Sequence, residues 1–334
     1  MVKCFFSLVF MLTLGTAVAQ TGEEFVMAFG SCNRQNLPQP MWEVIAKEQP
    51  NLWVWLGDNI YGDSDDMSVL KAKYETQANQ EGYKKLTAQV PVIGTWDDHD
   101  YGRNDAGKEY PHKKESQQLA LDFLKEPANS IRRNQEGIYA AYDYKLKNKT
   151  VKVILLDARY HQDALKKDSV KAYIPNTQGD LLGEAQWEWL EKQLKESTAD
   201  AHIIGSGIQF IPDQHPYEKW ANFPSARKRL FDLLAKTQAK GVILISGDRH
   251  IGEFSKMEVE GVDYPIHEIT SSGLTHSSTN NTSEYNPYRV GPLVNQKHFG
   301  LFTFQEKENT FAVEVKLVGE DGKSFHTEKI VLSE

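Results

Sequence analysis

The chain has 334 residues, a formal charge of -8 at pH 7 and 40% hydrophobic residues, which is an ordinary balance for a globular protein. That length suits one large domain or two small ones. The acidic balance and the lack of a basic stripe argue against nucleic acid as a bulk electrostatic partner, so we expect no nucleic-acid-binding surface. A few arginines or lysines can still bind an anion locally.

The first nineteen residues are typical of a cleaved secretory signal. Lys3 supplies the charged start, Phe5–Leu14 the apolar core and Ala17–Ala19 the small-residue cleavage site. The apolar run is too short for a comfortable membrane span, although an uncleaved anchor remains an alternative. We therefore predict a signal peptide over residues 1–19 and an exported protein, periplasmic or secreted, that has no membrane span once the signal is cleaved.

Cys32 is the only cysteine left after that segment is removed. A lone cysteine in an exported protein cannot form an internal disulfide. It is either a small buried hydrophobe or a thiolate metal ligand, and its position in the fold decides between the two.

Seven apolar, β-branched runs along the chain end abruptly in Gly, Ser or Asp. Continuous apolar runs of this length are typical of strands covered on both faces. The runs are Phe25–Asn33, Leu52–Asn59, Pro91–Asp100, Val151–Tyr160, Ala201–Gln209, Gly241–His250 and Ile266–His276. Helical spacing of apolar residues occurs between them, at Pro40–Glu48, Gly183–Ser197 and Pro224–Gln238. Strands that alternate with helices indicate a layered α/β fold.

The last stretch changes character. Gly300–Gln305, Thr310–Val318 and Ser324–Leu332 are predicted to be antiparallel strands joined by short turns. Two longer polar connections, Tyr101–Tyr139 and Asp163–Gly183, are expected to cover the site and to contain some helix. No repeat or linker interrupts the chain, so we predict a single domain over residues 20–334.

Metal-competent donors follow four of the predicted strands. They are Cys32, Asp58 with Tyr61, the run Asp97–Asp100, and Asp248 with His250. Each group alone has an ordinary explanation, such as a turn, a helix cap or a surface histidine. Ligands of layered α/β folds collect at the carboxyl ends of the strands. Four such groups in succession therefore favour a shared metal site.

The donor types indicate which ions to expect. Carboxylates suit hard cations, whereas a thiolate with a phenolate suits a stronger Lewis acid such as ferric iron. An aspartate such as Asp58, at the mouth of a strand, can bridge two ions. Two ions can clamp a phosphoryl oxygen and hold a hydroxide for in-line attack. His99, beside the ligands, would then protonate the leaving oxygen.

The motifs SCN, GDNIYGD, TWDDHDYGRND, LDARYH and SGDRH occur in this order, and with them the chain resembles the PhoD-like alkaline phosphatase/phosphodiesterase family of the metallophosphoesterase superfamily. The resemblance covers about Phe25 to His276. It implies a four-layer αββα sandwich with mixed sheets. It also implies Fe3+ and Ca2+ as cofactors, with other divalent metals as alternatives.

By the same resemblance, Cys32 and Tyr61 would bind iron and Asp58 would bridge the metals. Asp248 and His250 match the late ligand motif. The resemblance therefore assigns a metal-binding role to each of these five residues.

The TWDDHD motif supplies the rest of the implied site. Asp98 takes the place where the wider superfamily has an asparagine ligand, and spacing does not separate it from Asp97. His99 would contact the phosphate or act as the general acid.

The chain departs from the family pattern at both ends. The mature chain is expected to begin at the catalytic strand, without the amino-terminal β-domain of longer members. Its carboxyl end is predicted to be strands in place of a lid helix. Both departures leave substrate access and preference open.

Four further residues near the motifs are candidates for substrate contact or structure. Arg159 can grip phosphate bidentately or form a surface ion pair. Arg103 and Asn104 follow the ligand cluster and can reach substrate, although loop structure explains them equally well. Arg249 lies between two proposed ligands, and we expect its side chain to point away from the metals.

The last candidates concern the edge of the site. His276, Ser271 and Ser272 lie at the end of another predicted strand, and we expect them to line the pocket. His215 and Trp220 are predicted to lie at its rim.

The function that these patterns favour is an exported, metal-dependent phosphoesterase acting on a small phosphate ester. We lean towards a broad activity that includes diesters, because no evident basic cluster awaits a second terminal charge. The alternatives are a phosphomonoesterase alone and a catalytically inactive secreted binding relative. The sequence does not set the oligomeric state.

Overall fold

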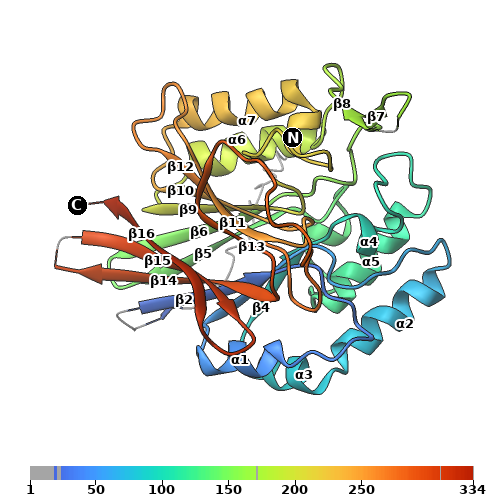
Figure 1. The fold of residues 1–334 in the computed structure, drawn as a ribbon, viewed down its shortest axis with the longest axis horizontal. Coiled ribbons are helices and arrows are strands. Elements are labelled where there is room, and N and C mark those ends of the chain that lie inside the picture. The colour runs from blue at the N-terminus through green and yellow to red at the C-terminus, as the bar shows by residue number, and fades with distance from the viewer. Residues whose placement is uncertain (1–18, 21–23, 171, 309, 334) are drawn as a thin grey trace, which may run out of the picture.

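The computed structural model describes residues 19–20, 24–170, 172–308 and 310–333 (Figure 1). The predicted signal peptide lies outside these residues except for Ala19, which forms strand β1 with Gln20. No helix within the described ranges is long and apolar enough to cross a membrane.

Two large mixed sheets form the centre of the molecule. One has the strand order β1-β5-β6-β9-β10-β12-β11-β13 and the other the order β16-β15-β14-β2-β3-β4. The strands of the first sheet are β1 Ala19–Gln20, β5 Ala140–Leu146, β6 Lys149–Leu155, β9 Ala201–Ser206, β10 Val242–Ser246, β11 Gly252–Met257, β12 Ile266–Ser271 and β13 Arg289–Val294. Those of the second are β2 Glu24–Gly30, β3 Leu52–Leu56, β4 Val92–Thr95, β14 His298–Lys307, β15 Thr310–Gly319 and β16 Ser324–Ser333.

Helices cover the outer faces of both sheets. The helices are α1 Met41–Lys47, α2 Met67–Ala78, α3 Glu81–Thr87, α4 Asp98–Tyr101, α5 Lys113–Phe123, α6 Glu184–Lys195 and α7 Pro224–Thr237, with short 3-10 turns at Ile131–Arg133 and Trp220–Asn222. Helices α1, α2 and α3 lie below the sheets in Figure 1, and α6 and α7 lie above them.

Three buried clusters correspond to the three interfaces of this sandwich. The first joins α1, α2, α3 and α5 to the outer face of the six-stranded sheet, the second lies between the sheets, and the third joins α6 and α7 to β6, β9 and β10. Strand β3 shows how one apolar run serves two interfaces, because successive side chains point to opposite faces. Trp53 and Trp55 face the helices, while Val54 and Leu56 face the other sheet. The predicted four-layer αββα architecture is confirmed.

The seven predicted internal strands and the three predicted helices are all present, as are the three carboxyl-terminal strands. Residues 101–139 contain α5, as expected of a polar connection with some helix. The helix expected in the second connection is wrong: the described residues of 163–183 contain no helix but form a small hairpin, β7 Lys166–Lys167 with β8 Tyr173–Ile174. The prediction of a single domain over residues 20–334 stays a prediction.

Parallel pairing brings the carboxyl ends of several strands to the same edge. Strands β2, β3 and β4 are parallel in one sheet, and β6, β9, β10 and β12 are parallel in the other. The segments that leave these ends carry the predicted donors. The topology therefore allows residues far apart in sequence to meet between the two sheets.

Candidate metal centre

Acidic, thiol and imidazole side chains converge at the edge where these strands end. Within each of three groups, one potential ligand atom per residue lies within 4.8 Å of the others. The groups are Cys32, Asp58 and His250; Asp58, Asp98 and His99; and Asp58, Asp97, Asp98 and Asp248. Asp58 belongs to all three, which is the position that a bridging ligand requires.

The Cys32 thiol is completely buried among polar groups. Its Sγ lies 3.0 Å from Ser272 Oγ and 3.4 Å from Asp58 Oδ2. Burial raises the pKa of this thiol well above its ordinary value, and the charge of Asp58 raises it further. A thiolate at this position therefore requires a neighbouring cation. The polar partners of the thiol also argue against the reading of Cys32 as a small buried hydrophobe.

Tyr61 joins the cluster through its hydroxyl. The hydroxyl oxygen lies 2.9 Å from His250 Nε2 and 3.0 Å from His276 Nε2, and these two nitrogens are 3.2 Å apart. Burial lowers the pKa of His250 to about 4 and that of His276 to about 3, so both imidazoles are neutral at neutral pH. A phenol and two neutral imidazoles that converge on one point are a plausible donor set for a transition metal.

The carboxylates are closer together than free anions tolerate. Burial raises the pKa of Asp58 well above its usual range and that of Asp248 to about 6, and in both cases the charge of Asp98 adds to the effect. Asp58 Oδ1 and Asp97 Oδ2 are buried and have no hydrogen-bond partner among the described residues. Buried acceptors without partners are costly. Cations between these oxygens would satisfy them, so the residues present fit a metal site.

Both Asp97 and Asp98 lie in the cluster, and their contacts do not separate them as ligands. Asp97 Oδ1 accepts from Arg159 Nε at 2.6 Å. Asp98 accepts from the backbone N–H groups of His99 at 2.9 Å and Asp105 at 2.7 Å. Each carboxylate retains lone pairs for an ion.

The backbone at four of these residues is in the left-handed region. The φ angles are 58° at Cys32, 49° at Asp58, 67° at Asp248 and 53° at His250. Residues other than glycine rarely adopt this conformation, and it persists where the surroundings impose it, commonly at functional sites. The four residues lie in the three segments that follow β2, β3 and β10, where the backbone re-aims the side chains immediately after each strand ends.

Asp100 ties two of the ligand segments together. Its Oδ1 accepts from the backbone N–H groups of Asp97 at 2.7 Å and Asp58 at 3.1 Å, and its Oδ2 accepts from Asn59 N–H at 3.2 Å. Asp58 and Asp97 follow different strands, β3 and β4. One buried carboxylate therefore fixes the relative position of two candidate ligands.

His99 lies at the edge of the cluster with a carboxylate partner. Its Nδ1 is 2.6 Å from Asp63 Oδ1, and its ring centroid is 4.3 Å from that of Tyr61. Burial alone would lower the pKa of His99, but the hydrogen bond to Asp63 and the negative charges of Asp98, Asp63 and Asp248 together outweigh it, so the pKa is raised. The side chain is 19% exposed. A protonated imidazole in this position can donate to a leaving oxygen.

Arg159 is fully buried, so the surface ion pair considered from sequence is wrong. Its guanidinium pairs with Asp97 at 2.6 Å and Glu218 at 2.8 Å. Arg103 and Asn104 are exposed, and Arg103 pairs with Asp65. Among the contacts of the described residues, none joins Arg103 or Asn104 to the metal-ligand cluster. Their roles in substrate binding stay predictions.

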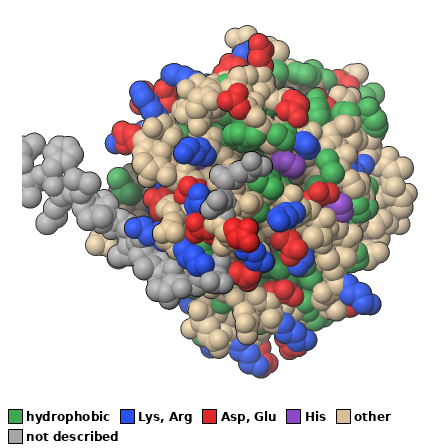
Figure 2. All heavy atoms as spheres, turned by 90° about the vertical axis from the view of Figure 1, so that its left-hand side faces the viewer, with side chains coloured by type: hydrophobic (Ala, Val, Ile, Leu, Met, Phe, Trp, Pro, Cys, Tyr) green, Lys and Arg blue, Asp and Glu red, His purple; other side chains and the backbone are tan. Residues whose placement is uncertain are grey.

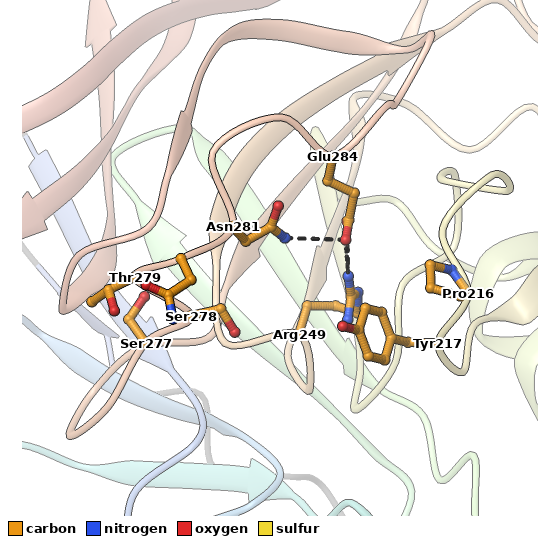
Figure 3. Close-up of a pocket in the computed structure, with 9 residues that line it drawn as sticks. Pro216, Tyr217, Arg249, Ser277, Ser278, Thr279, Asn281 and Glu284 are labelled. Atoms are coloured by element: carbon orange, nitrogen blue, oxygen red, sulfur yellow. Dashed lines mark hydrogen bonds and ion pairs between the residues drawn. The ribbon is translucent and has the colours of Figure 1, made fainter.

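Arg249 lines a cavity of about 500 Å³ beside the cluster (Figure 3). Its guanidinium donates to both oxygens of Glu284, at 2.7 and 2.8 Å, and lies 4.1 Å from the ring centroid of Tyr217. These contacts agree with the structural role expected of Arg249. Ser277 and Ser278 also line the cavity and both donate to the backbone carbonyl of His250, so the cavity borders the metal-ligand cluster.

The prediction that Trp220 lies at the rim is wrong. Its side chain is 0% exposed, and its ring centroid lies 5.0 Å from that of Phe210. The polar residues around Trp220 in the sequence suggested the rim, but its ring packs in the core, with its centroid 6.2 Å from that of Trp187 in helix α6. His215, in the same loop, is also buried.

Some residues of the site were missed or underrated from sequence. Asp63 belongs to the GDNIYGD motif and Asp100 to TWDDHD, and the extra carboxylate in each motif was the available signal. His276 was expected only to line the pocket, but it contacts Tyr61 and His250 directly. Arg34 had been given no role and lies over the Tyr61 ring, 4.6 Å from its centroid.

Comparison with known proteins gives matches at the level of family, sequence and fold. The family model described as PhoD-like phosphatase matches residues 27–317. Alkaline phosphatase D of Bacillus subtilis is 24% identical over an alignment of 308 residues, and the match covers 75% of this chain and 51% of the relative. The chain thus spans about half the length of the curated relative that it matches.

Solved structures show the same fold at low sequence identity. A structure of PhoD superposes with a TM-score of 0.72 at 17% identity and covers 94% of this chain and 71% of that chain. GAP50, the anchor in the inner membrane complex of Plasmodium, gives a TM-score of 0.62 at 14% identity and covers 94% and 90%. A dimetal phosphatase from Danio rerio gives 0.52 at 15% identity and covers 92% and 99%.

Proposed function

The chain belongs to the PhoD-like phosphatase family, and from that premise we propose that it is a metal-dependent phosphoesterase acting on phosphate diesters, monoesters or both. The observation that carries this proposal is the convergence of Cys32, Asp58, Asp98 and His250 from four separate segments. Because one fold can host many functions, the proposal rests on the side chains of the site and not on the fold.

We assign two kinds of ligand to the two sides of Asp58. Cys32, Tyr61 and His250 would hold Fe3+, since thiolate, phenolate and imidazole suit that ion. Asp248 with Asp97 or Asp98 would hold Ca2+ or another divalent cation, since carboxylates suit hard ions. Bound there, the cations would neutralise charge on the phosphoryl oxygens and lower the pKa of the attacking water.

His99 is the proposed general acid. Asp63 accepts from its Nδ1, which orients the ring and leaves Nε2 to donate a proton to the departing oxygen. The same hydrogen bond, with the charges of the neighbouring carboxylates, raises the pKa of His99 and so favours the protonated imidazole that a general acid requires.

Arg159 supports the site through Asp97 in our proposal, in place of the direct phosphate contact first expected. Its burial and its pairing with Asp97 and Glu218 occupy the guanidinium. The pairing holds the Asp97 carboxylate with Oδ2 free for an ion. Arg103 and Asn104 remain candidates for substrate contact from the exposed side.

We further propose that the protein is exported, on the basis of its amino-terminal sequence, and that it acts on a small phosphate ester. On the face drawn in Figure 2, basic and acidic side chains are interspersed and form no basic stripe. The alternative of a secreted binding relative is less well supported, because the complete donor set is present.

Hydrolysis of p-nitrophenyl phosphate and bis-p-nitrophenyl phosphate, before and after chelation and after addition of calcium, tests the proposed function. We expect turnover that chelation abolishes and metal restores. Folded, metal-loaded protein that turns over neither ester would instead support the binding relative.

A further inference from the structure

Arg34 lies at the mouth of the candidate metal centre. It follows Cys32 by two residues, and its backbone N–H donates to Thr275 Oγ1 at 2.8 Å. The residue is exposed, and its guanidinium carbon lies 4.6 Å from the ring centroid of Tyr61. The Tyr61 hydroxyl contacts His250 and His276. The Tyr61 ring therefore lies between the permanent positive charge of Arg34 and the histidines of the ligand cluster.

Arg34 differs from the other eight arginines of the chain in how its guanidinium is engaged. Seven of them pair with carboxylates: Arg103, Arg132, Arg133, Arg159, Arg229, Arg249 and Arg289. Arg227 donates to the backbone carbonyls of Phe210 and Ile211. Among the described residues, Arg34 has a stacking contact with Tyr61 but no hydrogen bond or ion pair from its guanidinium.

This arrangement suits an incoming anion. A guanidinium is planar, always charged and matched to two oxygens of a phosphate, and it is more weakly hydrated than an ammonium group. The stacking on Tyr61 restrains the side chain without using its N–H donors. The structure therefore offers five free donors beside the point where the proposed reaction takes place.

We propose that Arg34 binds the phosphoryl oxygens of the substrate and favours phosphomonoesters over diesters. This inference rests on the proposed phosphoesterase function. A monoester at alkaline pH carries two negative charges on three terminal oxygens, whereas a diester carries one charge on two. The additional charge and oxygen of the monoester are the groups that a free guanidinium recognises. No other described arginine in contact with the cluster is unpaired.

Matched substrates test the preference directly. p-Nitrophenyl phosphate and methyl p-nitrophenyl phosphate share a leaving group and differ in the second terminal charge. We expect Arg34→Ala to lower kcat/KM for the monoester by about ten- to a hundredfold, the size of a lost charge-assisted hydrogen bond, and for the diester by roughly threefold or less. Arg34→Lys should retain part of the activity that Arg34→Ala loses, because lysine keeps the positive charge but lacks the paired N–H donors of a guanidinium.

Arg229→Ala is the control variant. Arg229 is also a surface arginine, but it pairs with Glu184 on the helical layer formed by α6 and α7. Arg229→Ala should change kcat/KM for neither ester. Equal losses for the two esters in Arg34→Ala would overturn the monoester preference, and unchanged kinetics for both would overturn the contact itself.

Binding of inorganic phosphate to the metal-loaded protein, measured by calorimetry, separates this inference from the proposed function. Wild type should bind phosphate about ten- to a hundredfold more tightly than Arg34→Ala. Tighter binding by wild type without turnover of any ester would remove the proposed function and leave the Arg34 site intact. Equal binding by the two proteins would overturn the Arg34 site, whatever the activity.

Discussion

Removal of the Asp100 carboxylate should destabilise the protein and loosen the candidate metal centre together. The side chain is fully buried and accepts three backbone hydrogen bonds, from Asp58, Asn59 and Asp97. Asp100→Ala would leave all three N–H groups in a buried environment without a partner. These groups belong to the segments that carry Asp58 and Asp97, so both positions would lose their restraint.

The size of the effect follows from the three bonds. Each buried donor left unpaired costs about 1–3 kcal/mol, so Asp100→Ala should lower the free energy of unfolding by about 3–9 kcal/mol. That is a large part of the roughly 5–15 kcal/mol that stabilises a typical domain. Asp100→Asn keeps the oxygen that serves Asp58 and Asp97 and turns its amide towards the Asn59 N–H, so it should cost about 1–2 kcal/mol.

Urea unfolding at pH 8.5, with metal content measured on the same samples, provides the assay. Burial raises the pKa of Asp100 to about 7, so the group is ionised at that pH. Asp168→Ala is the matched control. Asp168 accepts from the backbone N–H groups of Val170 and Ala172, but in an exposed turn where water replaces the lost acceptor. It should cost about 1 kcal/mol or less.

An Asp100→Ala protein as stable as the Asp168→Ala control, with wild-type metal content, would refute this reasoning. That result would mean that the two ligand segments hold their positions without the shared carboxylate. Loss of metal without loss of stability would limit the role of Asp100 to the site.

The remaining predictions concern the ligands, the general acid and one buried histidine. Cys32→Ser should lose bound iron and most activity while staying folded, and retention of full iron by elemental analysis would contradict the thiolate assignment. If Tyr61 binds ferric iron, the purified protein should show a visible charge-transfer band that Tyr61→Phe abolishes. His99→Ala should keep its metals and turn over slowly, least so for esters with good leaving groups; an equal loss across leaving groups would assign His99 to phosphate binding instead. Burial lowers the pKa of His298 from 6.5 to about 4 in the folded protein, so its contribution to stability is fully present above pH 6.5 and is lost as the pH falls towards 4. The free energy of unfolding should fall by about 3 kcal/mol over this pH range in the wild type, and this fall should be missing in His298→Asn. Identical pH profiles of stability for the two proteins would contradict the prediction.

The buried strands could be predicted from sequence because their apolar runs have two covered faces. The run Leu52–Leu56 supplies indoles to the helical layer and aliphatic groups to the space between the sheets. Strands β5, β11 and β13 were not predicted. Strand β5 has alternating exposed residues, β11 contains Glu253, Ser255 and Lys256, and β13 contains glycine and proline. Such sequences pair at or near sheet edges for reasons that local patterns do not reveal.

The candidate ligands could be predicted because they directly follow strands whose carboxyl ends meet at one edge. The partners that hold them required the fold. Arg159 follows a strand end like the ligands do, yet its guanidinium is enclosed by Asp97 and Glu218, which are distant in sequence. Arg34 has no special local sequence, and its significance comes from the ring of Tyr61 beneath it.

The central claim is that donors from separate segments share the same metal ions through Asp58. The most direct test is the metal content per chain of wild type and Asp58→Asn after dialysis, measured by elemental analysis with the fold checked by circular dichroism. We expect about two ions per wild-type chain, as in two-metal sites, and loss of both in the folded variant. A folded Asp58→Asn protein with the full wild-type metal content would contradict the shared centre.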